Sequence, residues 1–277
     1  MNKIKLWLRI IRPQTLFASI CPVCIALIIS GVQQPLIAVT TLLCALALQI
    51  LSNLINDYYD YLRGTDQKGR IGFKRALAEG EVNIKEMKCA CICALLISIG
   101  TGLVLVIKGG WPILLIGVSA IIFAWLYTAT SHSLSYLGIA DLFVLLYYGL
   151  IAAAGTYYLQ TGHCHSSVLF AGAVNGLISE CVLMINNIRD IDTDRENGKR
   201  TLPVRFGRQT GEMILWIIVL LIPLLSWLAF GWSLTMLTVL PAAWLVCKVH
   251  RSHGAALNKC LLAAGLTNLI YTVLAAI

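Results

Sequence analysis

Two short segments of the sequence share a pattern of amide and carboxylate side chains. Each places an aspartate four residues after an asparagine: Asn56 and Asp60 in INDYYD, and Asn186 and Asp190 in INNIRD. Residues spaced by three or four lie on one face of a helix, so each pair would point in one direction. The second face continues to Asp194, again four residues on. The repeat predicts two halves of one binding site.

The thirteen acidic residues of the chain are concentrated around these two segments. Five glutamates lie in these groups, and for them we expect ordinary solvated positions. Aspartates at the end of an apolar helix are different, because an ionisable group there is costly unless it is paired or functional. Only Asp141 and Glu180 stand alone. The two groups are Asp57, Asp60, Asp66, Glu79, Glu81 and Glu86, and Asp190, Asp192, Asp194, Glu196 and Glu212.

Two acidic faces turned toward one cavity would repel each other unless cations lie between them. Carboxylate and amide oxygens are hard ligands that suit Mg²⁺, which keeps several waters and is often completed by substrate phosphates. Nearby basic side chains would neutralise the rest of a phosphate group. These are Arg70, Lys74, Arg75, Arg189, Lys199 and Arg200.

A membrane enzyme with such a site is expected to act on a lipid-linked diphosphate. Loss of pyrophosphate from an allylic diphosphate leaves a carbocation-like carbon, and bound metal stabilises the departing negative charge. The cation must be shielded from water, which a cavity within the membrane provides. An electron-rich acceptor then attacks it.

The elements that must position these residues are long apolar helices. The chain has 58% hydrophobic and 12% charged residues, whereas a soluble domain averages about a quarter charged residues. Continuous apolar runs near 20 residues predict membrane-spanning helices rather than the alternating strands of a barrel. The expected spans are 14–32, 36–56, 86–107, 112–130, 137–160, 168–188, 211–230, 232–248 and 255–277.

The net charge of +8 reports the orientation of these spans. With nine spans, every Lys and Arg except Lys108 falls on the side of the N-terminus. The positive-inside rule then predicts a cytoplasmic N-terminus, with both acidic groups on the cytoplasmic side of the cell membrane. Nucleic acid is excluded as a partner, because no basic soluble domain exists to bind it. Membrane lipid is the expected surrounding.

The cysteines and the N-terminus add little to the functional interpretation. Nine of the ten cysteines lie in apolar spans, where we expect them to pack as small apolar residues. The segment His163-Cys164-His165 offers metal ligands, but no other ligand cluster accompanies it on its side, so its role stays open. No cleavable signal peptide is expected, because the apolar run after Met1–Arg12 is too long and lacks a clear cleavage site.

The acidic segments resemble those of a known family. NDYYDYLRGTD (56–66) and NNIRDIDTDRENGKRTLPVRFG (186–207) are similar to the paired motifs of UbiA-type intramembrane aromatic prenyltransferases. Within that family the similarity is greatest to the 1,4-dihydroxy-2-naphthoate polyprenyltransferase branch of menaquinone synthesis. IRPQTL (11–16), YTATSHSLSYLGIADLFVLLYYG (127–149) and GTYYLQTG (155–162) also resemble that branch.

The resemblance implies an all-α integral membrane fold, with about nine transmembrane helices around a central cavity that opens laterally to lipid. The chain would be a single domain over 1–277, with acidic-motif halves near 14–107 and 137–230. It would transfer a polyprenyl group from a polyprenyl diphosphate to the carboxylated ring carbon of 1,4-dihydroxy-2-naphthoate. Carbon dioxide would be lost, giving a demethylmenaquinone.

The resemblance also implies roles for individual residues. The Mg²⁺ ligands would be Asn56, Asp57, Asp60, Asp66, Asp190 and Asp194. The catalytic residues would be Asp60, Asp190, Asp194 and Tyr127. Substrate would be bound by Asn56, Arg70, Lys74, Asn186, Arg189, Lys199, Arg200 and Arg12.

The sequence departs from the family pattern at two positions. Gly64 stands where the family repeats an acid, and we expect Asp66 to take its place. His132 stands where relatives often carry a basic residue, and a partly protonated histidine is a weaker phosphate partner. Tyr127 could contact the cavity or anchor the chain at the interface. Arg12 could orient the acceptor or only set the topology.

Other functions remain open at this point. The same fold and chemistry could serve 4-hydroxybenzoate, homogentisate, a porphyrin or a glycerol phosphate as the acceptor. A secondary transporter with internal repeats would place acids deep within the spans, where only Glu180 is expected. The motif of a CDP-alcohol phosphotransferase, another intramembrane enzyme with aspartates, is absent from the sequence.

Overall fold

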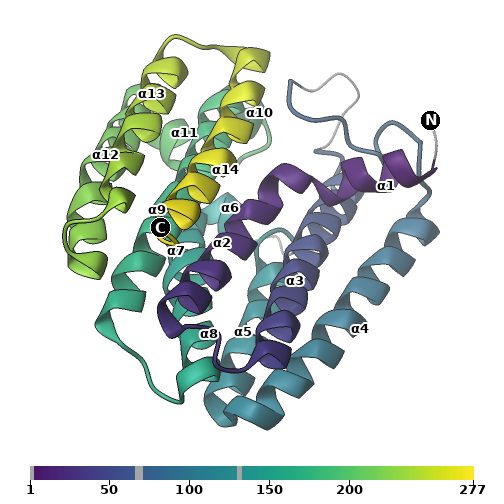
Figure 1. Cartoon of the computed structure of the whole chain (residues 1–277). Coiled ribbons are helices and arrows are strands. Elements are labelled where there is room, and N and C mark those ends of the chain that lie inside the picture. The colour runs from purple at the N-terminus through teal and green to yellow at the C-terminus, as the bar shows by residue number, and fades with distance from the viewer. Residues whose placement is uncertain (1–2, 66–70, 130–132) are drawn as a thin grey trace.

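The computed structural model describes residues 3–65, 71–129 and 133–277, without the side chain of Ser135. In these ranges the chain is built from α-helices and a few short 3₁₀ or π segments, labelled η (Figure 1). The elements are α1 (Lys3–Ile11), α2 (Pro13–Ser30), α3 (Pro35–Leu62), α4 (Ile84–Gly109), α5 (Trp111–Leu126), α6 (Leu134–Leu137), α7 (Ala140–Leu145), η1 (Leu146–Ile151), α8 (Ala152–Thr161), α9 (Ser166–Arg189), α10 (Ile191–Glu196), α11 (Leu202–Phe206), α12 (Arg208–Phe230), η2 (Leu234–Thr238), α13 (Val239–His250), η3 (Gly254–Ala256) and α14 (Leu257–Leu274).

The helices fit a multi-pass membrane protein. Seven described helical segments are long and apolar enough to cross a membrane, and two shorter apolar ones, Trp111–Leu126 and Leu234–His250, coincide with the fourth and eighth expected spans. The expected all-α membrane class is therefore confirmed. The count of nine spans and the cytoplasmic N-terminus stay predictions.

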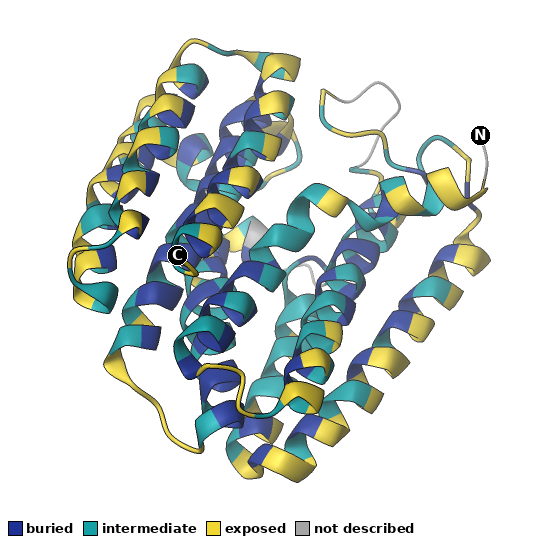
Figure 2. Cartoon of the chain, viewed as in Figure 1, coloured by how far each residue is buried: buried dark blue, intermediate teal, exposed yellow. Residues whose placement is uncertain are grey.

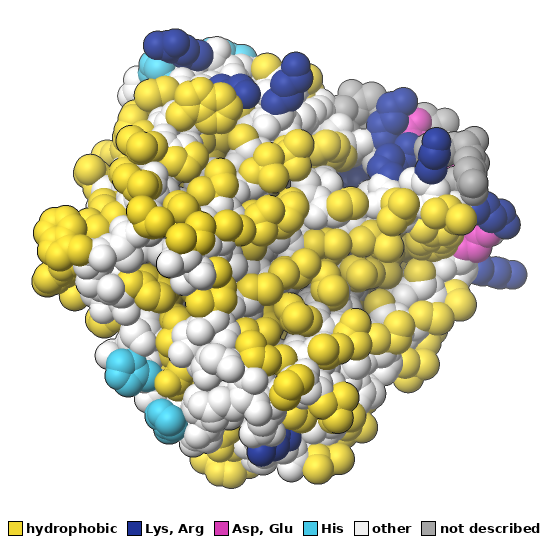
Figure 3. All heavy atoms as spheres, in the orientation of Figure 1, with side chains coloured by type: hydrophobic (Ala, Val, Ile, Leu, Met, Phe, Trp, Pro, Cys, Tyr) yellow, Lys and Arg dark blue, Asp and Glu magenta, His cyan; other side chains and the backbone are white. Residues whose placement is uncertain are grey.

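The outer surface of the bundle is apolar. Figure 2 shows that α4, α12 and α13 expose their outer faces while their inner faces are buried. Large side chains such as Leu220 and Ile107 are exposed there, and Figure 3 shows a broad hydrophobic belt, with Lys and Arg gathered mainly at one end. Trp111 and Trp232 project from helix ends, as aromatic residues do at membrane interfaces.

The core is centred on α9, which packs against α2, η1, α12 and α14. Met184 and Ile185 of α9 are fully buried in the largest hydrophobic cluster, together with Leu215 of α12 and Tyr271 of α14. A second cluster joins α3 and α4 around Leu51. Because α2 packs on both α3 and α9, it sets the separation of the helices that carry the two acidic motifs.

One glutamate expected to be merely solvated has a structural role. Glu86 forms a capping box with Asn83 at the start of α4: the Asn83 side chain accepts from the Glu86 amide at 2.8 Å, and Glu86 accepts from the Asn83 amide at 3.0 Å. Reciprocal bonds of this kind satisfy amides that have no partner within the helix.

Glycines allow the closest helix contact in the core. A Cβ built on Gly149 of η1 would lie 2.7 Å from the carbonyl oxygen of Gly172, and one on Gly176 would lie 2.7 Å from the carbonyl oxygen of Leu145. Small residues let helix backbones approach closely in a membrane. This contact fixes α7 and η1 against α9.

Gly176→Ala is therefore expected to destabilise the protein. The added methyl has no space, and overpacking of this kind costs about 1–3 kcal/mol. Thermal unfolding in detergent measures the effect. Gly100→Ala on the outer face of α4, where a Cβ meets no atom within 4 Å, is the matched control and should not lower the midpoint. Equal midpoints for the two variants would contradict the close contact.

Candidate active site

The first acidic motif lies on the last turns of α3. This helix continues to Leu62, beyond the expected end of the span at 56, so that Asn56 and Asp60 stand on a rigid helical face. Beyond the helix, Gly64 adopts a left-handed φ of 72°. Thr65 then donates to the Asp60 carbonyl from its amide at 3.1 Å and from its hydroxyl at 3.0 Å. These bonds fix the chain directly after the motif.

The second motif spans a break between two helices. α9 ends at Arg189, and Asp190 leaves helical geometry with a ψ of 14° before α10 begins. The amide of Asp194 still donates to the Asp190 carbonyl at 2.7 Å. The expected single helical face is thus replaced by a tight junction, but Asn186, Asp190 and Asp194 line the same pocket.

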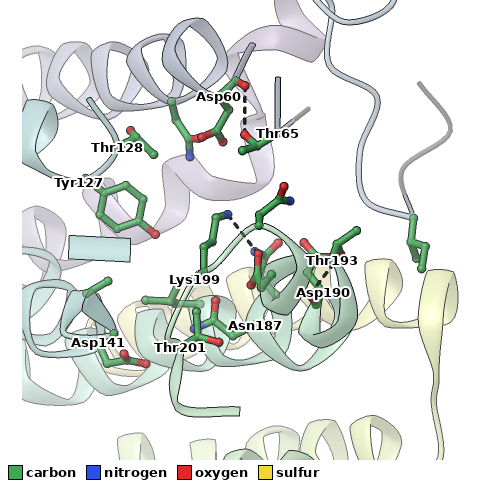
Figure 4. A pocket seen from close by; sticks show the side chains of 18 of the residues that line it. Asp60, Thr65, Tyr127, Thr128, Asp141, Asn187, Asp190, Thr193, Lys199 and Thr201 are labelled. Carbon is green, nitrogen blue, oxygen red and sulfur yellow. Dashed lines mark hydrogen bonds and ion pairs between the residues drawn. The ribbon is translucent and has the colours of Figure 1, made fainter. Parts of the chain in front are cut away.

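The two motifs meet across a small polar pocket of about 80 Å³. Figure 4 shows side chains from different elements, among them Asp60, Tyr127 and Lys199, pointing toward one another. Other polar residues of the wall come from the connections after α3, α5 and α10. The lining includes Asn56, Asp60, Thr65, Arg75, Tyr127, Thr128, Asp141, Asn186, Asn187, Asp190, Thr193, Asp194, Asn197, Lys199 and Thr201.

A buried arginine orients the second motif. Arg189 donates to both carboxylate oxygens of Asp190, at 2.7 and 2.6 Å. The same guanidinium donates at 2.7 Å to the side-chain oxygens of Asn186 and of Asn258 from α14. A planar guanidinium with several fixed acceptors holds its partners rigidly. Arg189 therefore positions Asp190 and Asn186, and Asn258 is a supporting residue that the sequence pattern did not reveal.

Lys199 lies between the two motifs. Its ammonium is 3.1 Å from the Asp194 carboxylate. Burial lowers the pKa of Lys199, but attraction by Asp194 and Asp60 outweighs burial, so the pKa lies above its ordinary value. The Lys199 side chain is therefore positively charged at neutral pH and lies close to both acidic motifs.

Asp57 is not among the residues that line the polar pocket. It is buried and forms ion pairs with Arg12 and Arg75. Arg12 precedes α2 with a left-handed φ of 57°, an uncommon conformation for a residue with a side chain. Asp57 thus ties the start of α2 to α3 and to Arg75. Its expected role as a Mg²⁺ ligand stays a prediction.

The remaining sequence candidates fall into three groups. Tyr127 lines the pocket, as expected for a cavity contact. Lys74 and Arg200 have exposed side chains and are not among the lining residues of either described cavity, so their contact with substrate stays a prediction. Asp66, Arg70 and His132 lie outside the described residues.

A larger and mostly apolar cavity of about 480 Å³ adjoins the polar pocket. Its apolar walls come from α2 to α5, α7 to α9 and η1. Five residues line both spaces: Asn56, Arg75, Tyr127, Leu183 and Asn186. A charged head group in the polar pocket and an apolar chain in the larger cavity would therefore be continuous.

Two polar residues deeper in α3 were not predicted from the sequence as part of the site. Asn53 donates at 2.9 Å to the Ile11 carbonyl and to the Thr15 hydroxyl. Gln49, one turn earlier, donates to the same hydroxyl at 3.3 Å, and both residues line the apolar cavity. The signal was present in the sequence, because 49, 53, 56 and 60 are spaced as one helix face.

The side-chain oxygens of the two motifs are of the kind that suits Mg²⁺. The side-chain oxygen of Asn56 is buried without a hydrogen-bond partner among the described residues, and it stands beside carboxylates at the polar pocket. No group of three or more His, Cys, Asp or Glu close enough to hold a metal occurs in the described part of the chain. Coordination shared with substrate phosphates and water, which Mg²⁺ favours, fits carboxylates placed on two sides.

Comparison with known proteins decides the family. The model of the UbiA prenyltransferase family matches residues 17–270. The chain belongs to this family. Two UbiA relatives are named 1,4-dihydroxy-2-naphthoate octaprenyltransferase. The protein of Haemophilus influenzae is 34% identical over 83% of this chain and 78% of its own. The protein of Escherichia coli K12 is 36% identical over 75% of this chain and 70% of its own.

A solved UbiA structure shares the fold. The homologue from Archaeoglobus fulgidus, bound to DMAPP and Mg²⁺, superposes with a TM-score of 0.70 over 97% of both chains, at 18% identity. The likeness of fold extends to nearly the whole length of this UbiA protein.

Proposed function

We propose that this protein is a Mg²⁺-dependent polyprenyltransferase. It transfers a polyprenyl group from a polyprenyl diphosphate to 1,4-dihydroxy-2-naphthoate, with loss of carbon dioxide, and so forms the quinol form of a demethylmenaquinone in menaquinone biosynthesis. The observation that carries the proposal is the polar pocket between two acidic motifs, which opens into an apolar cavity. The names of the curated relatives support this acceptor.

The residues divide the work of binding the diphosphate. Asn56, Asp60, Asp190 and Asp194 would hold Mg²⁺, which when bound neutralises the diphosphate and stabilises it as the leaving group. Lys199 supplies a further positive charge beside Asp194. Charge stabilisation by groups already in place is among the largest contributions to catalysis.

The apolar cavity performs a different task. Its walls accept the isoprenoid tail and keep water away from the reacting allylic carbon, as a carbocation-like centre requires. Tyr127 stands at the boundary of both cavities and is placed to contact the reacting end. Arg12, at the wall of the larger cavity, is assigned to orient the acceptor.

We assign the whole chain to one catalytic domain, because residues from both acidic-motif halves line the polar pocket. The active site faces the cytoplasm in this proposal. Support comes from the distribution of Lys and Arg in the sequence, nearly all of which falls on the side of the two motifs.

The test is product formation in membranes that contain the protein. Octaprenyl diphosphate is supplied with either 1,4-dihydroxy-2-naphthoate or 4-hydroxybenzoate, in Mg²⁺ or with EDTA. Prenylation of the naphthoate alone, lost with EDTA and restored by Mg²⁺, is the expected result. Transfer to hydroxybenzoate instead would overturn the acceptor and keep the chemistry. Transfer that continues after metal removal would contradict the role of the acidic motifs.

A further inference from the structure

Two acidic side chains outside the motifs lie beside the polar pocket. Asp141 stands in the first turn of α7 and lines the pocket. Glu180 lies on α9 with only 6% of its surface exposed. It is spaced three and seven residues from Leu183 and Asn187, two lining residues, so it occupies the same helix face deeper in the membrane. Neither acid belongs to the binding of the diphosphate proposed above.

The two carboxyl groups lack ordinary partners. Both side-chain oxygens of Glu180 and one of Asp141 are buried without a hydrogen-bond partner among the described residues. Asp141 is near enough to Glu180 for the two carboxyl groups to interact, both electrostatically and directly through their side chains. Carboxylates of like charge repel each other strongly where water is excluded, and a proton held by one of the two groups relieves that repulsion. The close glycine contact between η1 and α9 keeps their helices together.

Tyr127 connects this pair to the place of reaction. The phenol interacts electrostatically with Asp141, Glu180 and Asp60. Tyr127 also lines both cavities, and its hydroxyl points into the polar pocket (Figure 4). Tyr127 therefore lies at the polar pocket and within electrostatic range of both acids.

We propose that the Asp141–Glu180 pair, acting through Tyr127, takes the proton of the acceptor hydroxyl next to the carboxylated carbon and later returns it. This inference rests on the proposed function. In this proposal Asp141 and Glu180 hold the proton between its removal and its return (the proton store), and Tyr127 is the residue that contacts the acceptor.

The electrons and protons of the step balance. As the hydroxyl loses its proton, its oxygen becomes a ketone and the carboxylated carbon forms a bond to the allylic carbon, whose bond to the diphosphate oxygen breaks. The carbon then bears a carboxylate beside a ketone. Loss of carbon dioxide leaves an enolate, and the pair returns the proton to its oxygen, which restores the aromatic hydroxyl and gives the quinol. The pair ends as it began, and no other reactant is needed.

The experiment compares acceptors of graded acidity. Glu180→Gln and Asp141→Asn are assayed in single-turnover prenyl transfer, with 1,4-dihydroxy-2-naphthoate and with a ring-fluorinated analogue whose hydroxyl is more acidic. We expect each variant to slow transfer to the native acceptor by about 10²-fold, the usual contribution of a positioned proton acceptor. The deficit should shrink with the fluorinated acceptor, because its hydroxyl depends less on a base.

The controls separate this proposal from the others. Binding of the prenyl diphosphate with Mg²⁺ and thermal stability should match the wild type in both variants. Asp192→Asn, on the exposed side of α10, should behave as the wild type. Equal deficits for both acceptors, full activity, or loss of diphosphate binding would overturn the proton store. Absence of transfer by the wild type itself would overturn the proposed function and this inference with it.

Discussion

Asp60→Asn and Asp190→Asn are each expected to lower kcat/KM for prenyl transfer by about 10³-fold. Each change keeps the shape of the side chain but removes a negative charge facing the polar pocket, and metal-assisted charge stabilisation is worth several kcal/mol. The measurement is steady-state transfer of a labelled prenyl group over a range of Mg²⁺ concentrations. More Mg²⁺ should restore part of the lost rate, because the variants bind the metal more weakly.

The double variant should lose little more than either single one. Residues that hold one ligand between them act as a unit, and their effects are not additive. Asp192→Asn is a matched control, since Asp192 lies on the same short helix as Asp194 but is exposed and pairs only loosely with Arg195 at 3.5 Å. Near-normal activity in either single variant would contradict a site shared between α3 and the α9–α10 junction.

Lys199→Met is expected to reduce kcat/KM by about 10²-fold, as the loss of one positioned positive group at a developing anion typically does. The decrease should appear in kcat/KM for the prenyl diphosphate, while KM for the acceptor should be unchanged. Lys199→Arg should recover part of the activity, because the charge is kept while the geometry changes. Loss of acceptor affinity alone would place Lys199 at a different substrate.

The charge of Lys199 also sets an expectation for pH. Its pKa is raised, so its ion pair is fully present below the ordinary lysine value of about 10.4 and is lost only as pH rises through the higher folded value. Between pH 7 and pH 9, Lys199→Met should therefore show the same fractional deficit throughout. A deficit that disappears toward pH 9 would mean that the ammonium loses its proton in that range.

Much of the fold could be predicted from the sequence because the membrane imposes it. Apolar runs long enough to cross a bilayer must be helical, since no water satisfies the backbone there. The ends of the helices were less predictable. α3 runs past the apolar segment into NDYYDYL, because hydrophobicity reports lipid contact and not helix length. The expected span ended at residue 56, before Asp60.

The candidate site was predictable where spacing alone places side chains. Asn56 and Asp60 share a face in the structure as they do in the pattern. The sequence could not show that Asp57 differs in role from Asn56 and Asp60, because residues three apart are also neighbours on a helix. Only the structure shows that Asp57 forms ion pairs with Arg12 and Arg75. The break at Asp190 and the approach of Asp141 to Glu180 depend on packing between distant elements, which no local pattern encodes.

The placement of α2 has a practical consequence. α2 packs against α3 and α9, whereas these two helices hardly touch each other and face across the polar pocket. A diphosphate with its metal ions would therefore act as a cross-link between two motif helices that are otherwise joined through intervening helices such as α2 and α8. Ligand at 100 times its Kd stabilises the folded state by about 2.7 kcal/mol. Thermal melting with pyrophosphate and Mg²⁺ could thus report inhibitors of this enzyme directly, without a lipid substrate or a radioactive label.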